Sequence, residues 1–359
     1  CLIYAGGTIT GRRENDPRTG QDVIIQPANK VALLESLPEL QRLQEYQPLS
    51  GLEYPANITN ADVKFFKAID SANVVPQDWL ELAKLIFRDR EKYHGFVVTH
   101  GTDTMVYTAT ALGLLLQGLN KPVVLTGSQL PLQGELVSDA RTNLLDACRV
   151  AAQEIGEVVI CFGSLVVRGC RARKVSESDW LSFTSTEVLP VATIGVTLNI
   201  DNTVAFPRGP TTLNHLDISQ WEHNVCLVKL SPGMRRETMS AILNSGVKGV
   251  VIEGFGAGNI PDENAKPFYY LDIIGEAVQR GISVVLCSQA PIGRGEIFHT
   301  TVGKYLDVGV IDAFDMVPEA AVVKLMWVMG RTNVPQDIKA RMQNAFIGEL
   351  SGSRSASRA

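Results

Sequence analysis

The amino-acid sequence predicts an α/β protein of two domains, a larger N-terminal domain built around a parallel sheet and a smaller C-terminal one. Apolar runs of strand length alternate with amphipathic segments along most of the chain, and this order is typical of βαβ units. The 359 residues exceed the size at which a single hydrophobic core stops growing, so two domains are expected. Because 45% of the residues are hydrophobic and 20% are charged, the composition favours a globular protein over a disordered chain.

The N-terminal half contains the clearest alternation of candidate strands and helices. We expect strands at residues 2–4, 95–99, 122–126 and 157–162, and helices at residues 76–92, 104–119 and 138–155. Three of the strands end in small or hydroxyl residues, at 6–8 (GGT), 101–103 (GTD) and 126–129 (TGSQ). Because the carboxyl ends of parallel strands meet at one edge of a sheet, these turns are expected to line a shared crevice.

Two segments of the first 224 residues lack this periodicity. Residues 11–27 follow the first turn directly and are polar, with several Arg, Asp, Gly and Pro residues, which favours a mobile loop that could act as a lid. Residues 201–224 show little pattern, and we place an interdomain linker at residues 208–223. The N-terminal catalytic α/β domain is therefore expected at residues 1–207 and the C-terminal α/β domain at residues 224–350.

The C-terminal half repeats the α/β alternation on a smaller scale. Strands are expected at residues 225–230, 249–253 and 283–287, and helices at residues 236–245, 269–280, 318–329 and 335–349. The final residues, 351–359, are rich in Ser and Arg, a composition typical of a disordered tail.

Charge, hydropathy and cysteine content exclude several classes of function. The net charge is −5 and no basic block of the kind that follows a phosphate backbone occurs, so a nucleic-acid partner is not expected. No apolar run reaches the ~18 residues of a membrane span, and no membrane partner is expected. The histidines show no metal-binding spacing, so we expect no metal. Six scattered cysteines without a CxxC pair favour reduced thiols and hence a cytoplasmic location.

Two threonines on glycine-containing turns carry the strongest chemical signal. Thr8 follows Gly6 and Gly7, which allow a sharp turn and a close approach of the backbone to a ligand. Thr102 lies in the run HGTDT, at residues 100–104. A threonine hydroxyl is a weak nucleophile that needs a base or a positioned partner. A GGT turn alone is equally typical of plain structure, whereas the two motifs together are far more specific.

Other polar residues each have a structural and a chemical interpretation. Asp103 stands where a helix should begin, so it is either an N-terminal helix residue or a group that binds an ammonium or orients a lysine. Lys174 ends the basic segment 168–174, which is either a solvated loop or the source of a proton acceptor for threonine. For Asp70 and Ser71 the pattern alone favours ordinary loop polarity over a substrate clamp.

For three further candidates, the residue pattern gives little support for a catalytic or cofactor-binding role. His100 is expected to be a structural hydrogen-bonding residue at a strand end. Ser128 has no GxSxG context, so it is not expected to be a hydrolase-type nucleophile. The run GFGAGN at residues 254–259 is only loosely similar to a nucleotide-binding loop, and no cofactor is expected from it.

Taken together, these motifs resemble those of the bacterial-type L-asparaginases, and most of all their type I, cytoplasmic branch. The resemblance covers roughly residues 2–350 and is carried by residues 4–9 (YAGGTI), 100–105 (HGTDTM), 126–131 (TGSQLP), 168–174 (RGCRARK) and 254–259 (GFGAGN). It implies two Rossmann-like α/β domains, the smaller of them flavodoxin-like. The implied activity is hydrolysis of the side-chain amide of L-asparagine to L-aspartate and ammonia, without a metal or a cofactor.

The resemblance also implies roles for the residues of the two threonine motifs. Thr8 matches the family's nucleophile, which attacks the amide carbon. Thr102, Asp103 and Lys174 match a second catalytic group, in which Lys174 relays protons, while Asp103 orients Lys174 and contacts the substrate ammonium.

Thr102 and Asp103 also count among the implied substrate-binding residues. Asp70 and Ser71 match the family's substrate-binding pair, which reverses the interpretation favoured by pattern alone. Ser128 is a further implied binding residue. Asn259 matches an asparagine that the family supplies from a neighbouring subunit, so a homodimer or homotetramer is expected.

The sequence departs from the family at three places. The smallest departure is Thr10, which stands where the family pattern GGTI continues with glycine or alanine. The family's lid carries a catalytic tyrosine soon after the nucleophile, but no tyrosine occurs here between Thr8 and Tyr46, and residues 22–24 (DVI) stand near the expected position. At the regulatory asparagine site of type I members, Arg173 and Ala290 differ from the family pattern. Two alternatives therefore stay open: an asparagine-binding or sensing protein with lost or weak turnover, and a glutaminase-asparaginase that also takes L-glutamine.

Overall fold

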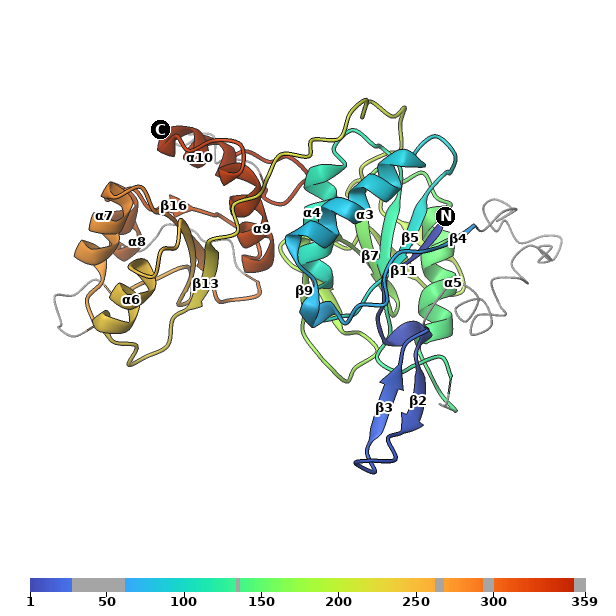
Figure 1. Ribbon diagram of the computed structural model, residues 1–359. Coiled ribbons are helices and arrows are strands. Elements are labelled where there is room, and N and C mark those ends of the chain that lie inside the picture. The colour runs from blue at the N-terminus through green and yellow to red at the C-terminus, as the bar shows by residue number, and fades with distance from the viewer. Residues whose placement is uncertain (28–61, 134–135, 262–267, 293–299, 352–359) are drawn as a thin grey trace. The chain divides into compact units, whose positions relative to one another are not determined.

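The computed structural model describes residues 1–27, 62–133, 136–261, 268–292 and 300–351 (Figure 1). The chain divides into two compact units, Cys1–Leu216 and Asp217–Ala359. This division falls within residues 208–223, and the domain and linker bounds given above stay predictions. The tail predicted at residues 351–359 lies, except for its first residue, outside the described residues.

In the N-terminal unit, eight of the described strands form one sheet in the order β12-β11-β8-β7-β6-β5-β1-β4. Its parallel part comprises β4 (Val63–Phe65), β1 (Leu2–Tyr4), β5 (Phe96–Thr99), β6 (Val123–Thr126) and β7 (Val158–Phe162). The antiparallel edge comprises β8 (Leu165–Arg168), β11 (Ala192–Ile194) and β12 (Leu198–Ile200). The expectation of an α/β fold with a parallel sheet is thus confirmed, with an antiparallel extension at one edge.

The strand order creates a switch point between β1 and β5. From β1 the chain continues to β4 on one side of it, and then returns to β5 on the other side. In doubly wound sheets, ligands bind in the crevice outside the carboxyl ends of the two strands where the order reverses. The turns after β1 and β5, which carry the two threonine motifs, therefore flank the crevice that this topology provides.

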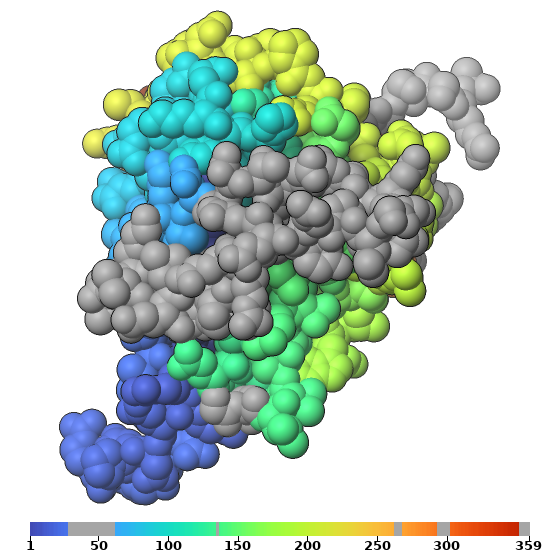
Figure 2. All heavy atoms as spheres, turned by 90° about the vertical axis from the view of Figure 1, so that its right-hand side faces the viewer, coloured from blue at the N-terminus to red at the C-terminus, as the bar shows by residue number. Residues whose placement is uncertain are grey.

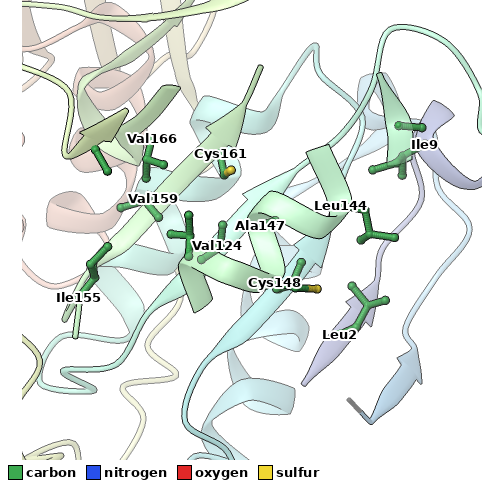
Figure 3. Close-up of a cluster of buried hydrophobic side chains, with 14 of the residues drawn as sticks. Leu2, Ile9, Val124, Leu144, Ala147, Cys148, Ile155, Val159, Cys161 and Val166 are labelled. Carbon is green, nitrogen blue, oxygen red and sulfur yellow. The ribbon is translucent and has the colours of Figure 1, made fainter. Parts of the chain in front are cut away.

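Helices cover both faces of the parallel strands. Strands β5 and β6 are buried at every residue, as expected for central parallel strands with helices on both faces. Helix α5 (Ala140–Ala151) places Leu144, Ala147 and Cys148 in one buried cluster with Val124 and Val159 of the sheet (Figure 3). Helix α4 (Met105–Leu115), almost wholly buried, contacts β7 and also α3 (Pro76–Arg88).

A two-residue hairpin loop explains the unexpected antiparallel edge. Strands β7 and β8 pair antiparallel with Phe162 opposite Leu165, and Gly163 between them has φ 59°. A two-residue loop that begins with glycine is typical of a hairpin, because glycine readily adopts the positive φ that the turn needs. The sequence prediction ends this strand at Phe162 without considering Gly163 as a hairpin turn. It therefore lacks β8 and the strands that pair beyond it.

Residues 11–27, expected to form a mobile loop, are instead a β-hairpin. Strands β2 (Arg12–Asn15) and β3 (Asp22–Ile25) pair antiparallel, and the hairpin projects from its unit (blue in Figures 1 and 2). Its base is tied down where the Tyr4 hydroxyl donates to Gln26 Oε1 at 2.6 Å. Both faces of the hairpin are largely exposed, so backbone pairing stabilises it without the apolar alternation that usually reveals a strand.

The C-terminal unit is a smaller parallel α/β sheet, as expected. Its strands β13 (Val225–Lys229), β14 (Gly249–Gly254), β15 (Ser283–Ser288) and β16 (Ile311–Asp312) are parallel and adjacent in that order. Its helices are α6 (Arg236–Leu243), α7 (Leu271–Gln279), α8 (Thr300–Asp307), α9 (Pro318–Met329) and α10 (Pro335–Met342). Helix α9 contacts the first three strands.

A buried ion pair ends the last helix earlier than the sequence predicts. The expected helix at residues 335–349 stops at Met342, because the Lys324 ammonium binds the carbonyl oxygens of Met342 at 2.8 Å and Asn344 at 2.7 Å. Glu349 lies 2.6 Å from the same ammonium, and both side chains are fully buried. The Glu349 carboxylate also accepts hydrogen bonds from the backbone N–H groups of Phe346 and Ile347.

We predict that Glu349→Leu destabilises the protein by about 3–5 kcal/mol, since it leaves a buried ammonium without its counter-ion. Urea unfolding followed by circular dichroism measures the change. The matched control is Glu237→Leu, which removes the carboxylate of an exposed pair with Arg235, in which both side chains are about two-thirds exposed. Equal unfolding midpoints for Glu349→Leu and the wild type would show that the pair is not needed for stability.

Candidate active site

The candidate site is assembled from loops that follow β1, β4 and β5. After β1, Gly6 and Gly7 have φ values of 99° and 92°, and the short 3₁₀ helix η1 (Thr8–Thr10) begins at once. After β4 comes Asp70, followed by the 3₁₀ helix η2 (Ser71–Asn73). After β5 the chain runs through the HGTDT residues into α4. Each loop leaves the same carboxyl edge of the sheet.

Glycines allow these loops to touch through their backbones. A Cβ atom on Gly6 would lie 2.1 Å from the carbonyl oxygen of Ile69, and one on Gly7 would lie 2.6 Å from the carbonyl group of His100. A Cβ atom on Gly101 would lie 2.4 Å from the hydroxyl of Ser71. All these distances are too short for real side chains, so the close packing of the three loops requires glycine at these positions.

Lys174 reaches the site from a separate hairpin. It ends β9 (Ala172–Lys174), where it pairs with Phe183 of β10 (Phe183–Ser185). Phe183 is buried and packs edge-on against Phe162 of β7, with ring centroids 5.2 Å apart. This contact anchors the hairpin to the main sheet and fixes the position from which the lysine extends.

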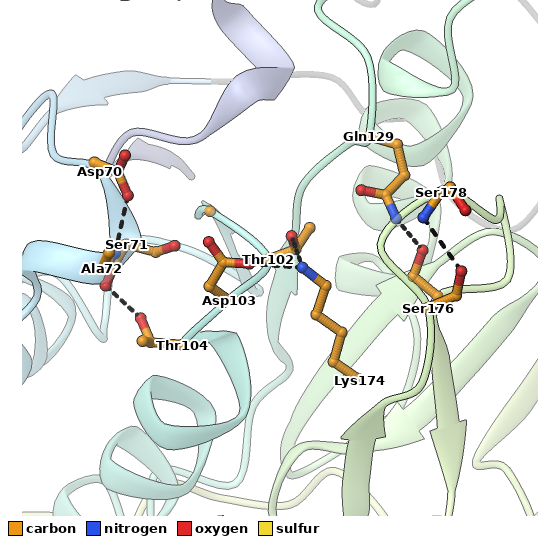
Figure 4. Close-up of polar contacts among 12 residues, drawn as sticks. Asp70, Ser71, Ala72, Thr102, Asp103, Thr104, Gln129, Lys174, Ser176 and Ser178 are labelled. Atoms are coloured by element: carbon orange, nitrogen blue, oxygen red, sulfur yellow. Dashed lines mark hydrogen bonds and ion pairs between the residues drawn. The ribbon is translucent and has the colours of Figure 1, made fainter.

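The Lys174 ammonium joins the hydroxyl and the carboxylate of the second threonine motif (Figure 4). Its Nζ donates to Thr102 Oγ1 at 2.8 Å and to Asp103 Oδ1 at 2.6 Å. The Lys174 side chain is 22% exposed and that of Asp103 is 62% exposed. The structure therefore brings together the three residues of the expected second catalytic group, in an arrangement that can pass protons between lysine and threonine.

The loop after β4 holds the expected substrate-binding pair beside this group. Ser71 is buried, and its carbonyl oxygen accepts a hydrogen bond from Thr104 Oγ1 at 2.7 Å. Asp70 is exposed, and its carboxylate caps η2 by accepting the backbone N–H of Ala72 at 2.9 Å. One carboxylate can cap the helix and still bind a cation, so the capping contact is compatible with either interpretation of Asp70.

The expected nucleophile, Thr8, makes few hydrogen bonds with the described residues. Thr8 is half-buried, and its carbonyl oxygen accepts the N–H of Gly11 at 2.9 Å. Across the described part of the chain, no hydrogen bond to the Thr8 hydroxyl occurs. Residues 22–24, near the expected place of the lid tyrosine, lie on β3, where Ile24 packs over Gly11. Tyr46, the next tyrosine in the sequence, lies outside the described residues.

The other two expected binding residues are placed differently. Ser128 follows β6 and is buried, and its hydroxyl donates to the carbonyl oxygen of Leu130 at 2.7 Å. A substrate would have to compete with this contact for the hydroxyl. Asn259 belongs to the C-terminal unit, in a turn closed by hydrogen bonds between its backbone and that of Phe255.

One positioning contact was missed at the sequence level. The side chain of Gln129 donates to the Ser182 hydroxyl and, at 3.4 Å, to the carbonyl oxygen of Asp179. It thereby ties the turn after β6 to the loop that joins Lys174 to β10. No local pattern marks this contact, because its partners lie about 50 residues away in the chain.

The described residues contain neither a group of metal-binding side chains nor a helix that could span a membrane. Nowhere in them do three or more His, Cys, Asp or Glu side chains form a group that could hold a metal ion. None of the helices described is long and apolar enough to cross a membrane.

Comparison with known proteins gives matches over the whole chain. The family model for the N-terminal domain of asparaginases matches residues 1–206, and that for the glutaminase/asparaginase C-terminal domain matches residues 224–342. The L-asparaginase of Dirofilaria immitis is 36% identical over 80% of this chain and 48% of its own length. The human 60 kDa lysophospholipase is 34% identical over 95% of this chain and 59% of its own length. The chain thus spans about half the length of these two relatives.

Other matches cover both proteins nearly completely. L-asparaginase 1 of Escherichia coli is 32% identical over 97% of both chains. The crystal structure of L-asparaginase I from Vibrio cholerae superposes with a TM-score of 0.80, at 29% identity over 98% of both chains. The resemblance inferred from the motifs is therefore confirmed, and the chain belongs to the asparaginase family.

Proposed function

We propose that this chain is an L-asparaginase, which hydrolyses the side-chain amide of L-asparagine to L-aspartate and ammonia with Thr8 as the nucleophile. The observation that carries the proposal is the contact of Lys174 Nζ with Thr102 Oγ1, at 2.8 Å, and with Asp103 Oδ1, at 2.6 Å, beside the Thr8 turn. Relatives that are named L-asparaginase support the choice of substrate.

In the proposed reaction, Thr8 Oγ1 attacks the amide carbon and forms a tetrahedral intermediate. The proton of the Thr8 hydroxyl passes through Thr102 and Lys174 to the departing nitrogen, so that ammonia leaves and an ester with Thr8 remains. Water then hydrolyses this ester to aspartate and restores the Thr8 hydroxyl. Backbone N–H groups around Thr102 stabilise the oxyanion in both steps.

Charge complementarity supports the proposed binding mode. Asp70 and Asp103 present exposed carboxylates that suit the α-ammonium of an amino acid. Ser71 supplies a hydroxyl donor for the α-carboxylate, between these two aspartates in the stick view (Figure 4). A free amino acid carries both groups, so a substrate with an unblocked α-amino and α-carboxyl group fits the site best.

We predict that Lys174→Met lowers the kcat for ammonia release by about 10²–10⁴-fold, the usual contribution of a proton-transfer group. Thr8→Ala should lower it at least as much, since it removes the attacking atom. Lys92→Met serves as the matched control because its side chain is 66% exposed and pairs with Asp89, outside the site. Full activity of either Lys174→Met or Thr8→Ala would contradict the assigned roles.

Substrate choice has its own test, in which ammonia release is measured across concentrations of L-asparagine and, in parallel, of L-glutamine. One additional methylene changes transition-state binding by about 1–3 kcal/mol, so we predict a kcat/KM for asparagine that is about 10–200-fold higher. Equal values for the two amides would instead identify a glutaminase-asparaginase.

A second candidate, an asparagine-binding protein with weak turnover, is favoured by one observation. The residues near the expected lid tyrosine are aspartate, valine and isoleucine, which cannot assist Thr8 as a phenol would. Calorimetry with asparagine distinguishes the candidates, because tight binding without ammonia release would support the sensor and rule out the enzyme.

The proposal extends to a cytoplasmic homodimer or homotetramer that shares its sites. The six cysteines, which all lie in the described residues, form no disulfide, and this fits a reducing compartment. Val175, Trp180 and Leu181, in the loop that follows Lys174, are each more than 40% exposed, and such apolar residues beside a site are typical of a surface covered in an assembly. The proposed contribution of the neighbouring subunit is Asn259.

Subunit mixing tests this sharing of sites. We predict that Thr8→Ala and Asn259→Ala proteins are each weakly active alone, but that a refolded mixture regains activity, because hybrid assemblies contain sites with an intact Thr8 and an intact neighbouring Asn259. A mixture no more active than the sum of its parts would place Asn259 outside the neighbour's site. A monomeric mass in light scattering would contradict the proposal altogether.

A further inference from the structure

A chain of buried hydrogen bonds leads from helix α3 to the backbone of the second threonine motif. Trp79 Nε1 donates to Thr108 Oγ1 at 3.0 Å, and Thr108 Oγ1 lies 2.9 Å from His100 Nε2. On its other side, His100 Nδ1 lies 2.7 Å from the carbonyl oxygen of Gly101. The side chains involved are almost inaccessible, with exposed fractions of 6%, 1% and 2% for Trp79, Thr108 and His100.

The two end groups of this series of hydrogen bonds, the Trp79 indole and the Gly101 carbonyl, determine where each proton lies. An indole N–H can only donate, and a carbonyl oxygen can only accept. The Gly101 carbonyl oxygen therefore requires a proton on His100 Nδ1. Because Trp79 donates to Thr108 Oγ1, the Thr108 hydroxyl can donate its own proton to His100 Nε2. Complete burial lowers the pKa of His100, outweighing the backbone hydrogen bond to Gly101 that raises it, so the neutral imidazole is favoured.

Fixing the Gly101 carbonyl also fixes the N–H of the next residue. The peptide group is planar and trans, so the C=O of Gly101 and the N–H of Thr102 point in opposite directions. Because the carbonyl oxygen is held on the buried side by His100, the N–H of Thr102 is directed away from the buried helices α3 and α4. The side chain of the same residue also takes part in the site, since the Thr102 hydroxyl accepts a hydrogen bond from the ammonium of Lys174.

We propose that His100 is a positioning residue, which holds the Gly101–Thr102 peptide so that the N–H of Thr102 can donate to the oxyanion. The inference rests on the proposed amidase function and assigns a task to a residue that does not touch the substrate. The imidazole acts through its Nδ1–H and neither gains nor loses a proton during the reaction. Thr108 keeps it in the required tautomer, and Trp79 orients Thr108.

Substitutions at His100 separate positioning from general stability. Asn has its side-chain N–H group at the same number of bonds from the backbone as Nδ1, so His100→Asn keeps the donor to Gly101. His100→Leu has similar bulk and no donor. We expect His100→Leu to lower kcat by about 10²-fold or more, the usual cost of an oxyanion donor, with KM changed less than about threefold. His100→Asn should recover most of that loss.

Leu114→Ala is the matched control, because it leaves a cavity on the same buried helix α4 and removes no hydrogen bond of the series that links Trp79, Thr108, His100 and Gly101. We expect it to lower the melting temperature without lowering kcat. The inference is overturned if His100→Leu keeps the wild-type kcat, if His100→Asn recovers nothing, or if Leu114→Ala, through its loss of stability alone, lowers kcat as much as His100→Leu does.

Nitrogen-15 NMR of the imidazole groups supplies a readout that does not depend on turnover. Because it is made on the wild-type protein, it stays informative if His100→Leu fails to fold. The wild-type protein should show one histidine, absent from the His100→Asn spectrum, with a protonated Nδ1 and an unprotonated Nε2. The opposite tautomer would overturn the inference. Failure of the proposed function is recognised separately, as an absence of ammonia release by the wild-type protein from asparagine and glutamine.

Discussion

The close approach of backbones at the carboxyl edge of the N-terminal sheet is the constraint on which the candidate site depends. Gly6 and Gly7 lie so near to Ile69 and His100 that no side chain could be placed there, and Gly101 lies equally near to Ser71. Such contacts bring three loops, far apart in sequence, within reach of one ligand. A Cβ atom at any of these positions would separate the loops, and the threonine and serine hydroxyls would separate with them.

The acid–base group of Lys174 and Thr102 is positioned by side-chain packing and buried hydrogen bonds rather than by close backbone contacts. Lys174 lies on a short hairpin that the packing of Phe183 on Phe162 fixes to the sheet. On the other side of Thr102, His100 and Thr108 hold the backbone through buried hydrogen bonds. Thr102 is thus held both through its hydroxyl and through its peptide group, which is the kind of preorganisation that stabilises developing charge.

The environment of Thr8 is less complete than that of Thr102. Its turn is fixed by the glycines and by the base of the β2–β3 hairpin, where Tyr4 binds Gln26. Yet the hairpin presents no phenol at residues 22–24, and the Thr8 hydroxyl accepts no hydrogen bond from the described residues. In the proposed asparaginase reaction, activation of the nucleophile therefore depends on the bound substrate and on the Lys174 group.

The sequence by itself determined the α/β class, the parallel direction of the N-terminal strands and the two threonine turns. These are local properties, because strand length, helical periodicity and glycine turns are each set within a few residues. It mispredicted the β2–β3 hairpin, whose largely exposed strands lack an apolar face, and it missed β8, which a two-residue loop joins to β7. Only the tertiary structure decided that Lys174 meets Thr102 and Asp103, that Gln129 reaches Ser182, and that His100 holds Gly101. Each of these contacts depends on which strands lie side by side, and the order of strands in a sheet is set by packing over the whole domain rather than by any local pattern.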